Sequence, residues 1–69
     1  MDLHWEDDFT ISTGMEGGMI IIRANREGLL SLAKNLISLA EETPGSHIHF
    51  DEHNSLESGS TDLIIERAR

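Results

Sequence analysis

The sequence contains no cysteine, a single proline, no tyrosine and only five lysine or arginine residues. Without cysteine, disulfide bridges and thiolate metal sites are excluded, so stability must come from packing, from a partner chain or from a metal held by His and carboxylates. Residues 1–8 are acidic and do not resemble a signal peptide. The longest apolar run, Met19–Ile22, is far shorter than the roughly 20 residues of a membrane span. We therefore expect a cytoplasmic protein with no membrane contact.

Charge of one sign dominates the chain. Thirteen acidic residues face five basic ones, which gives a net charge of −8. Proteins that bind a phosphate backbone rely on Lys and Arg, so a nucleic-acid partner is not expected. A strong negative field attracts basic partners and accelerates their approach. The alternative is that the charge serves solubility alone.

The apolar pattern predicts one domain over residues 1–69, with residues 1–7 as a flexible acidic segment. Alternating or β-branched apolar residues are typical of strands, and paired glycines or polar clusters are typical of the turns between them. Strands are predicted over residues 8–13, 19–24, 46–51 and 61–67. Residues 14–18 are predicted as a hairpin connection, and residues 52–60 as a polar loop in which Gly59 has a positive φ and Leu56 lies under the loop.

A helix is predicted over residues 26–42. Asn25 is suited to cap its N-terminus, and Thr43-Pro44-Gly45 is suited to end it. At about 100° per residue, the apolar side chains fall in one half of the helical wheel. They are Leu29, Leu30, Leu32, Ala33, Leu36, Ile37, Leu39 and Ala40. Ser31 and Asn35 fall in the polar half, so we expect them to face solvent.

These elements predict an α+β fold of order ββαββ, a single four-stranded and mainly antiparallel sheet with the helix on one face. Period-two alternation assigns the side chains to the two faces. The helix-facing set is Phe9, Ile11, Ile20, Ile22, Ile48, Phe50, Leu63 and Ile65. The opposite, open face carries Thr10, Ser12, Ile21, Arg23, His47, His49, Asp51, Ile64 and Glu66. This face is either an ordinary wetted sheet surface or an interface with a partner.

The conspicuous chemical cluster is His47-x-His49-x-Asp51-x-His53. Two His and one carboxylate are a known metal-ligand set. However, His47 and Asp51 would lie about 13 Å apart along a straight strand, too far to share one ion. We therefore expect no metal and no cofactor. No nucleophile elbow or phosphate-binding loop is present, which predicts that the protein is not an enzyme. Trp5 is either an interface anchor or a cap on one edge of the core.

Three stretches resemble a known family. They are residues 24–33 (ANREGLLSLA), residues 44–52 (PGSHIHFDE) and residues 56–66 (LESGSTDLIIE). Together they are similar to the immunity protein 32 family over about residues 20–67. The resemblance implies a bacterial immunity protein of a polymorphic toxin system, which binds a cognate toxin in the cytoplasm and neutralises it.

An acidic protein of this size is suited to a basic active-site cleft, where its carboxylates would stand in for phosphates. The predicted contact residues are His47, His49, Asp51, Glu52, His53, Asn54, Glu57 and Asp62. Two alternatives remain at this stage. One is a homodimeric structural or accessory subunit whose open sheet faces pack together, and the other is a small His/carboxylate metal-binding protein.

Overall fold

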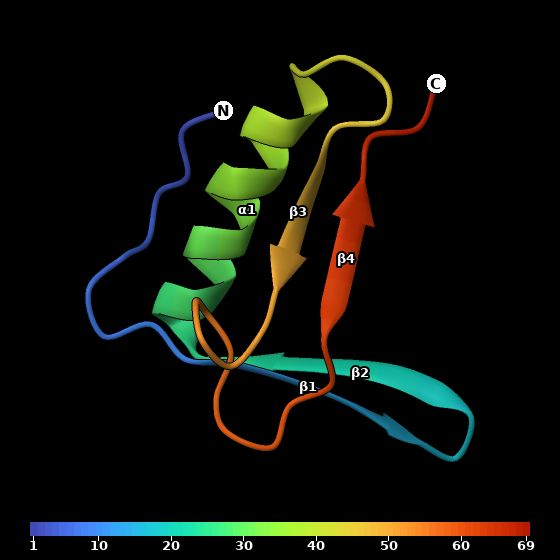
Figure 1. The fold of residues 1–69 in the computed structure, drawn as a ribbon. Helices are drawn as coiled ribbons and strands as arrows, with labels where there is room; N and C mark the ends of the chain where they lie inside the picture. The colour runs from blue at the N-terminus through green and yellow to red at the C-terminus, as the bar shows by residue number, and fades with distance from the viewer.

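The computed structural model describes residues 1–69 and confirms the α+β class and the element order ββαββ. The elements are β1 (Ile11–Glu16), β2 (Met19–Ala24), α1 (Arg26–Ala40), β3 (His47–Phe50) and β4 (Leu63–Glu66) (Figure 1). The bounds of β2 are those predicted, and the other elements begin or end within a few residues of their predicted bounds. α1 is neither long enough nor apolar enough to cross a membrane.

The β1–β2 hairpin turns at Gly17 and Gly18. Both glycines have positive φ, 56° and 79°, which a two-residue turn of type I′ requires. Glu16 pairs with Met19 directly across this turn. The connection is therefore shorter than the predicted residues 14–18, because Gly14 already belongs to β1.

The four strands form two separate antiparallel sheets, β1–β2 and β3–β4, so the prediction of one four-stranded sheet is wrong. In Figure 1 the β1–β2 hairpin runs across the lower end of the β3–β4 hairpin. A loop segment takes the place of a neighbouring strand along β1. The Glu57 N–H donates to the Ile11 carbonyl at 2.8 Å and the Thr61 N–H donates to the Thr13 carbonyl at 3.2 Å. Because these outward-facing groups of β1 are occupied, neither β3 nor β4 can pair with it.

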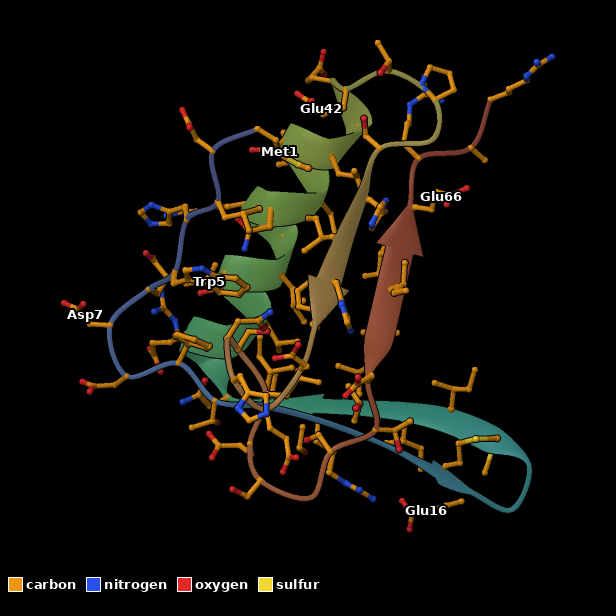
Figure 2. The ribbon with its side chains drawn as sticks, viewed as in Figure 1. Met1, Trp5, Asp7, Glu16, Glu42 and Glu66 are labelled. Atoms are coloured by element: carbon orange, nitrogen blue, oxygen red, sulfur yellow. The ribbon has the colours of Figure 1, made fainter.

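The core lies between α1, β3, β1 and the loop that precedes β4. Its buried apolar side chains are Ile11, Leu32, Leu39, Ile48, Phe50 and Leu56. Trp5 caps one edge of this core: it stacks on Phe9 with ring centroids 5.0 Å apart and meets Phe50 edge-on at 6.2 Å. Figure 2 shows Trp5 turned toward α1 while the neighbouring Asp7 points outward.

The predicted face assignment is confirmed for β3 but not for β2. Ile48 and Phe50 are buried and His49 is exposed, as the alternation predicted. Ile20 and Ile22 lie on the same side of their hairpin as Thr13, because Thr13 pairs with Ile22. Nevertheless Ile20 is 73% exposed and Ile22 is 42% exposed. No other element covers this stretch of the hairpin, so the prediction that both isoleucines pack against the helix is wrong.

The helix is also rotated from its predicted orientation. Ser31 and Asn35 are fully buried, whereas Leu29, Leu36 and Ile37 are exposed. The reason is the N-terminal segment, which runs along the polar side of α1. The His4 N–H donates to Asn35 Oδ1 at 2.7 Å, and the Glu6 N–H donates to Ser31 Oγ at 2.8 Å.

The predicted helix cap is confirmed. Asn25 Oδ1 accepts a hydrogen bond from the Gly28 N–H at 2.7 Å. The Asn25 side chain also joins the segment before β1, because the same oxygen accepts from the Thr10 N–H and its Nδ2 donates to the Asp8 carbonyl. One polar side chain therefore fixes both the start of α1 and the path of the chain that leads into β1.

Candidate partner-binding surface

The segment from Asp51 to Asp62, here called the acidic loop, leaves the end of β3 in a tight turn. The Asp51 carbonyl accepts from the Ser55 and Leu56 N–H groups at 3.1 and 2.9 Å. One carboxylate oxygen of Asp51 accepts from the His53 N–H at 2.8 Å. Asp side chains commonly bind backbone two residues ahead in this way. The sequence Asp-x-His therefore fixes the first turn of the loop.

Two further side chains hold the acidic loop in shape. Asn54 accepts from the Asp51 N–H at 3.1 Å and donates to the His49 carbonyl at 3.0 Å. Glu52 accepts from the N–H of Gly59, which has the predicted positive φ, 87°. Leu56 is buried beneath the loop as part of the core. The loop is thus ordered without a partner, which lowers the entropy cost of binding one.

Three of the predicted contact residues form a cluster, here called the His–Asp cluster. His49 Nε2 lies 3.4 Å from Asp62 Oδ2 and 3.9 Å from Asp51 Oδ2. β3 carries His49, while the two aspartates stand at the opposite ends of the acidic loop. The cluster therefore presents two carboxylates to solvent beside the His49 ring.

The other predicted residues are spread around this cluster. His47 lies on the same exposed side of β3, with Nδ1 3.5 Å from the Gly45 carbonyl, and is not part of the cluster. The side chains of His53 and Glu57 are exposed and make no hydrogen bond or ion pair within the chain. No group of three or more His and carboxylate side chains is placed to hold a metal ion. The arrangement therefore does not form a two-His, one-carboxylate set.

Acidic residues are not balanced by basic ones over one long stretch of the sequence, because no Lys or Arg lies between Lys34 and Arg67. The ion pairs made by Lys and Arg use three other carboxylates, those of Glu6, Glu16 and Glu27. The carboxylates without a Lys or Arg partner in this stretch are Glu41, Glu42, Asp51, Glu52, Glu57, Asp62 and Glu66. Their charge is free to interact with a partner.

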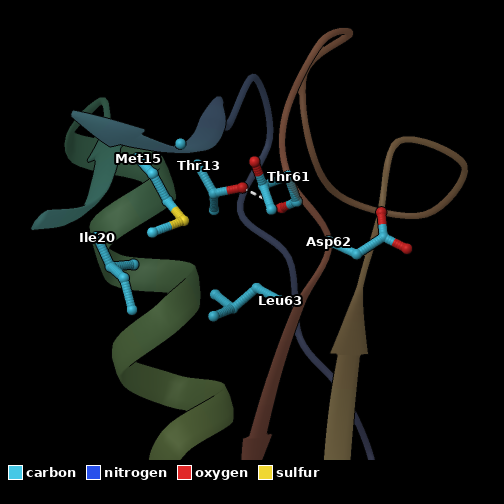
Figure 3. A pocket seen from close by; sticks show the side chains of 7 residues that line it. Thr13, Met15, Ile20, Thr61, Asp62 and Leu63 are labelled. Carbon is cyan, nitrogen blue, oxygen red and sulfur yellow. Dashed lines mark hydrogen bonds between the residues drawn. The ribbon is translucent and has the colours of Figure 1, made fainter. Parts of the chain in front are cut away.

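A shallow pocket of about 120 Å³ adjoins the acidic loop where the hairpin meets the start of β4. Figure 3 shows Met15, Ile20 and Leu63 converging on it, while the carboxylate of Asp62 points away from these apolar side chains. Thr13 Oγ1 donates to the Thr61 carbonyl beside the pocket. Asp62 therefore joins an apolar depression to the His–Asp cluster.

Ile20 and Leu63 were predicted to face the helix, and no role was predicted for Met15. The signal that pointed to an exposed site was the run Met19–Ile22, which is apolar on both faces of its strand. A single helix covers only one face of a sheet. When both faces of a strand are apolar, one of them therefore stays exposed.

The comparison with protein families matches the chain to one family, described as immunity protein 32, over residues 20–68. The chain belongs to the immunity protein 32 family. The matched residues include α1, β3, the acidic loop and β4, so every predicted contact residue lies within the region that immunity protein 32 members share. No curated protein and no solved structure matches the chain.

Proposed function

We propose that this member of the immunity protein 32 family acts in the cytoplasm of a bacterium, where it binds a cognate toxin stoichiometrically and neutralises it without catalysis. Its family membership supports an immunity role. The observation that carries the mode of action is the excess of carboxylates between Lys34 and Arg67, which have no Lys or Arg partner within the chain. A surface of this kind is suited to a toxin whose active-site cleft is basic.

The contact surface would be the acidic loop, the exposed side of β3 and the pocket beside Asp62. Carboxylates at the rim would set the association rate, because complementary charge steers diffusional encounter. Met15 and Leu63 would supply the apolar contact that sets the residence time, since most differences in affinity lie in the dissociation rate. The side chains of Asp51, Glu52 and Asn54 accept hydrogen bonds from backbone N–H groups, and these bonds keep the surface in one conformation before the toxin arrives.

The first test is affinity capture from the native organism with this protein as bait, followed by expression of the captured protein in a bacterial host. A single stoichiometric partner that stops growth alone, and permits growth when the two are co-expressed, is the expected result. A partner that is harmless alone, or a toxin that kills despite co-expression, would contradict an immunity role.

The second test locates the toxin-binding surface with double variants, each of which reverses two charges. Glu57→Lys with Asp62→Lys should slow association with the toxin by about tenfold or more at low ionic strength, because both are exposed carboxylates of the acidic loop and Asp62 also lines the pocket. The salt dependence of the rate should fall as well. Stopped-flow mixing at several salt concentrations measures both quantities.

The matched control is Glu41→Lys with Glu42→Lys, which changes the net charge equally at the end of α1. This control should change the association rate much less, because the two residues lie away from the acidic loop. Equal effects of the two double variants would mean that net charge alone matters, and would overturn the proposed surface.

A further inference from the structure

The two outer edges of the β1–β2 hairpin differ in whether their backbone groups have hydrogen-bond partners. The outer edge of β1 is occupied by the acidic loop: Ile11 and Thr13 bond to Glu57 and Thr61, and the Thr13 N–H also donates to Ser60 Oγ at 3.2 Å. Outside the β1–β2 ladder itself, no backbone hydrogen bond involves Met19–Ala24. The outer edge of β2 is therefore bare.

The register identifies which backbone groups of β2 point outward. In an antiparallel pair, residues alternate between those that bond to the partner strand and those whose N–H and C=O point away from it. Thr13 directs these groups outward to the acidic loop, and Thr13 pairs with Ile22. Ile20 is two residues away from Ile22 and shares its orientation. Ile20 and Ile22 thus present unpaired donors and acceptors to solvent, while the groups of Ile21 bond to β1.

A bare edge of this length is a template for pairing with another strand, and it lacks the usual devices that block such pairing. Pro, inward-pointing charges and bulges are the common protections. β2 has none of them in Met19–Ile22, and its only charged residue is Arg23 near its end. Arg23 lies on the other face of the hairpin, where it pairs with Glu16 at 2.8 Å.

We propose that β2 pairs antiparallel with β2 of a second copy of this chain, about a two-fold axis at Ile21. Ile20 of each copy then lies opposite Ile22 of the other, and the two residues exchange both backbone hydrogen bonds. The result is a continuous four-stranded sheet of order β1-β2-β2-β1. Since the axis is perpendicular to the sheet, both copies of α1 lie on the same side of it.

The side chains on that side fit a second copy. The helix presents a solvent-exposed stripe of Leu29, Ala33, Leu36, Ile37 and Ala40, and the hairpin adds Ile20 and Ile22. The five large side chains leave on the order of 500 Å² of apolar surface exposed, a substantial part of the about 800 Å² that each partner contributes to a standard interface. The stripe itself contains no carboxylate.

Charge repulsion between two copies is weakest where a surface carries no carboxylate. Each copy carries a net charge of −8, so two copies repel each other across their acidic loops. Neither β2 nor the helix stripe contains a carboxylate, so pairing through them adds little local repulsion. The small core is a second reason: six buried apolar side chains are few for a 69-residue chain, and association is a common source of the missing stability.

The direct test is the mass in solution, measured by sedimentation equilibrium over a wide concentration range. The expected mass is twice the 7.7 kDa of the chain. Ile20→Lys should give the single-chain mass, because the new charge would be buried opposite Ile22 of the second copy. Ile64→Lys is the matched control: Ile64 is likewise an exposed isoleucine on a strand, 59% exposed, and this variant should remain a dimer. A single-chain mass for the unmodified protein at all concentrations would overturn the proposal.

A mixing experiment tests the register even if the variants fold less well. Ile20→Lys and Ile22→Glu should each be monomeric alone, but an equimolar mixture should form a mixed dimer in which the two introduced charges lie opposite each other. Native mass spectrometry distinguishes the mixed dimer from either parent. Failure of the mixture to dimerise, while the unmodified protein does so, would rule out the two-fold axis at Ile21.

Amide hydrogen exchange tests the interface directly, with the Ile21 amide as an internal reference for the Ile20 and Ile22 amides. The Ile20 and Ile22 amides should be protected at concentrations where the dimer forms and exchange faster on dilution, whereas the Ile21 amide is bonded within the hairpin at every concentration. A dimer in which the Ile20 and Ile22 amides exchange rapidly would mean that β2 is not the interface. This outcome is separate from toxin binding: Glu57→Lys with Asp62→Lys should remain dimeric whatever the toxin assay shows.

Discussion

The acidic loop and the β2 edge are both exposed, but their backbones differ in one respect. The acidic loop satisfies its backbone from within the chain, through Asp51, Glu52 and Asn54, and presents charge. The β2 edge leaves its backbone groups open and presents apolar side chains. A preformed polar surface is suited to rapid capture of a foreign partner, whereas an open strand edge is suited to a partner that supplies another strand. This difference between the two surfaces supports the two proposed interfaces, one with the toxin and one with a second copy.

The N-terminal segment contributes to this difference. By binding Ser31 and Asn35, it covers the polar side of α1 and turns the stripe of Leu29, Leu36 and Ile37 toward solvent. Without that segment, the apolar half of the helix would be free to pack on a sheet in the usual way.

The largest effect is expected beneath the acidic loop. Phe50 is fully buried at the end of β3 and contacts Trp5, so Phe50→Ala should lower the free energy of unfolding by about 3–5 kcal/mol. Ile64→Ala, an exposed residue of the adjacent strand, should change it by less than about 0.5 kcal/mol. Urea denaturation measures both. If Phe50→Ala were as mild as Ile64→Ala, the acidic loop would not rest on the core.

A smaller effect is expected where the hairpin meets the helix. A Cβ at Gly28 would overlap the Thr10 carbonyl oxygen and lie 2.9 Å from Ala24 Cβ. Gly28→Ala should therefore lower the free energy of unfolding by about 1–3 kcal/mol, although helix propensity alone would raise it by about 1 kcal/mol. Thermal denaturation gives the sign directly. A stabilised variant would show that α1 can move away from the segment before β1. The position of the helix stripe would then be less constrained than that of the acidic loop.

The smallest effect concerns the N-terminal segment. Hydrogen bonds from the His4 and Lys34 side chains lower the pKa of Glu6 below its usual value of 4.5. The Glu6 carboxylate therefore stabilises the fold above that ordinary value, and the contribution is lost as the pH falls through the lowered pKa of the folded state. Glu6→Gln should have a lower thermal midpoint than the unmodified protein at pH 7, and the gap should close toward pH 3.

The matched control for Glu6 is its neighbour Asp7, whose side chain makes no hydrogen bond or ion pair within the chain. Asp7→Asn should not reproduce the pH-dependent gap. A gap for Glu6→Gln that persists unchanged at pH 3 would mean that the Glu6 carboxylate does not hold the N-terminal segment on α1 through its charge.

Local structure followed from the sequence, because it depends on neighbouring residues. The cap at Asn25, the strand Met19–Ala24 and the alternation of β3 were all predicted correctly. The positive φ of Gly59 was predicted as well. Each of these features is fixed by a side chain or backbone preference within a few positions along the chain.

The errors arose where a distant segment satisfied polar groups that look solvent-exposed in a helical wheel. Asn35 receives a backbone N–H from His4, thirty-one positions away, and Ser31 receives one from Glu6. The split of the sheet has the same origin, because the acidic loop occupies the edge of β1. Hydrophobic periodicity carries no information on such bonds. The side chains of the His–Asp cluster were predicted to share a surface, but their contact through Asp62 depends on the pairing of β3 with β4.

The bonds from Glu57 and Thr61 to β1 have a consequence for regulation. β1 bonds to the acidic loop along one edge and to β2 along the other, so the two proposed interfaces share a single strand between them. If toxin binding reduces the motion of the acidic loop against β1, it also reduces the motion of the hairpin and favours pairing with a second copy. By thermodynamic linkage, dimerisation must then favour toxin binding by the same free energy. A toxin-bound dimer would then be more stable than the free energies of toxin binding and of dimerisation, added together, predict. The two backbone hydrogen bonds from Glu57 and Thr61 to β1 would carry this cooperativity.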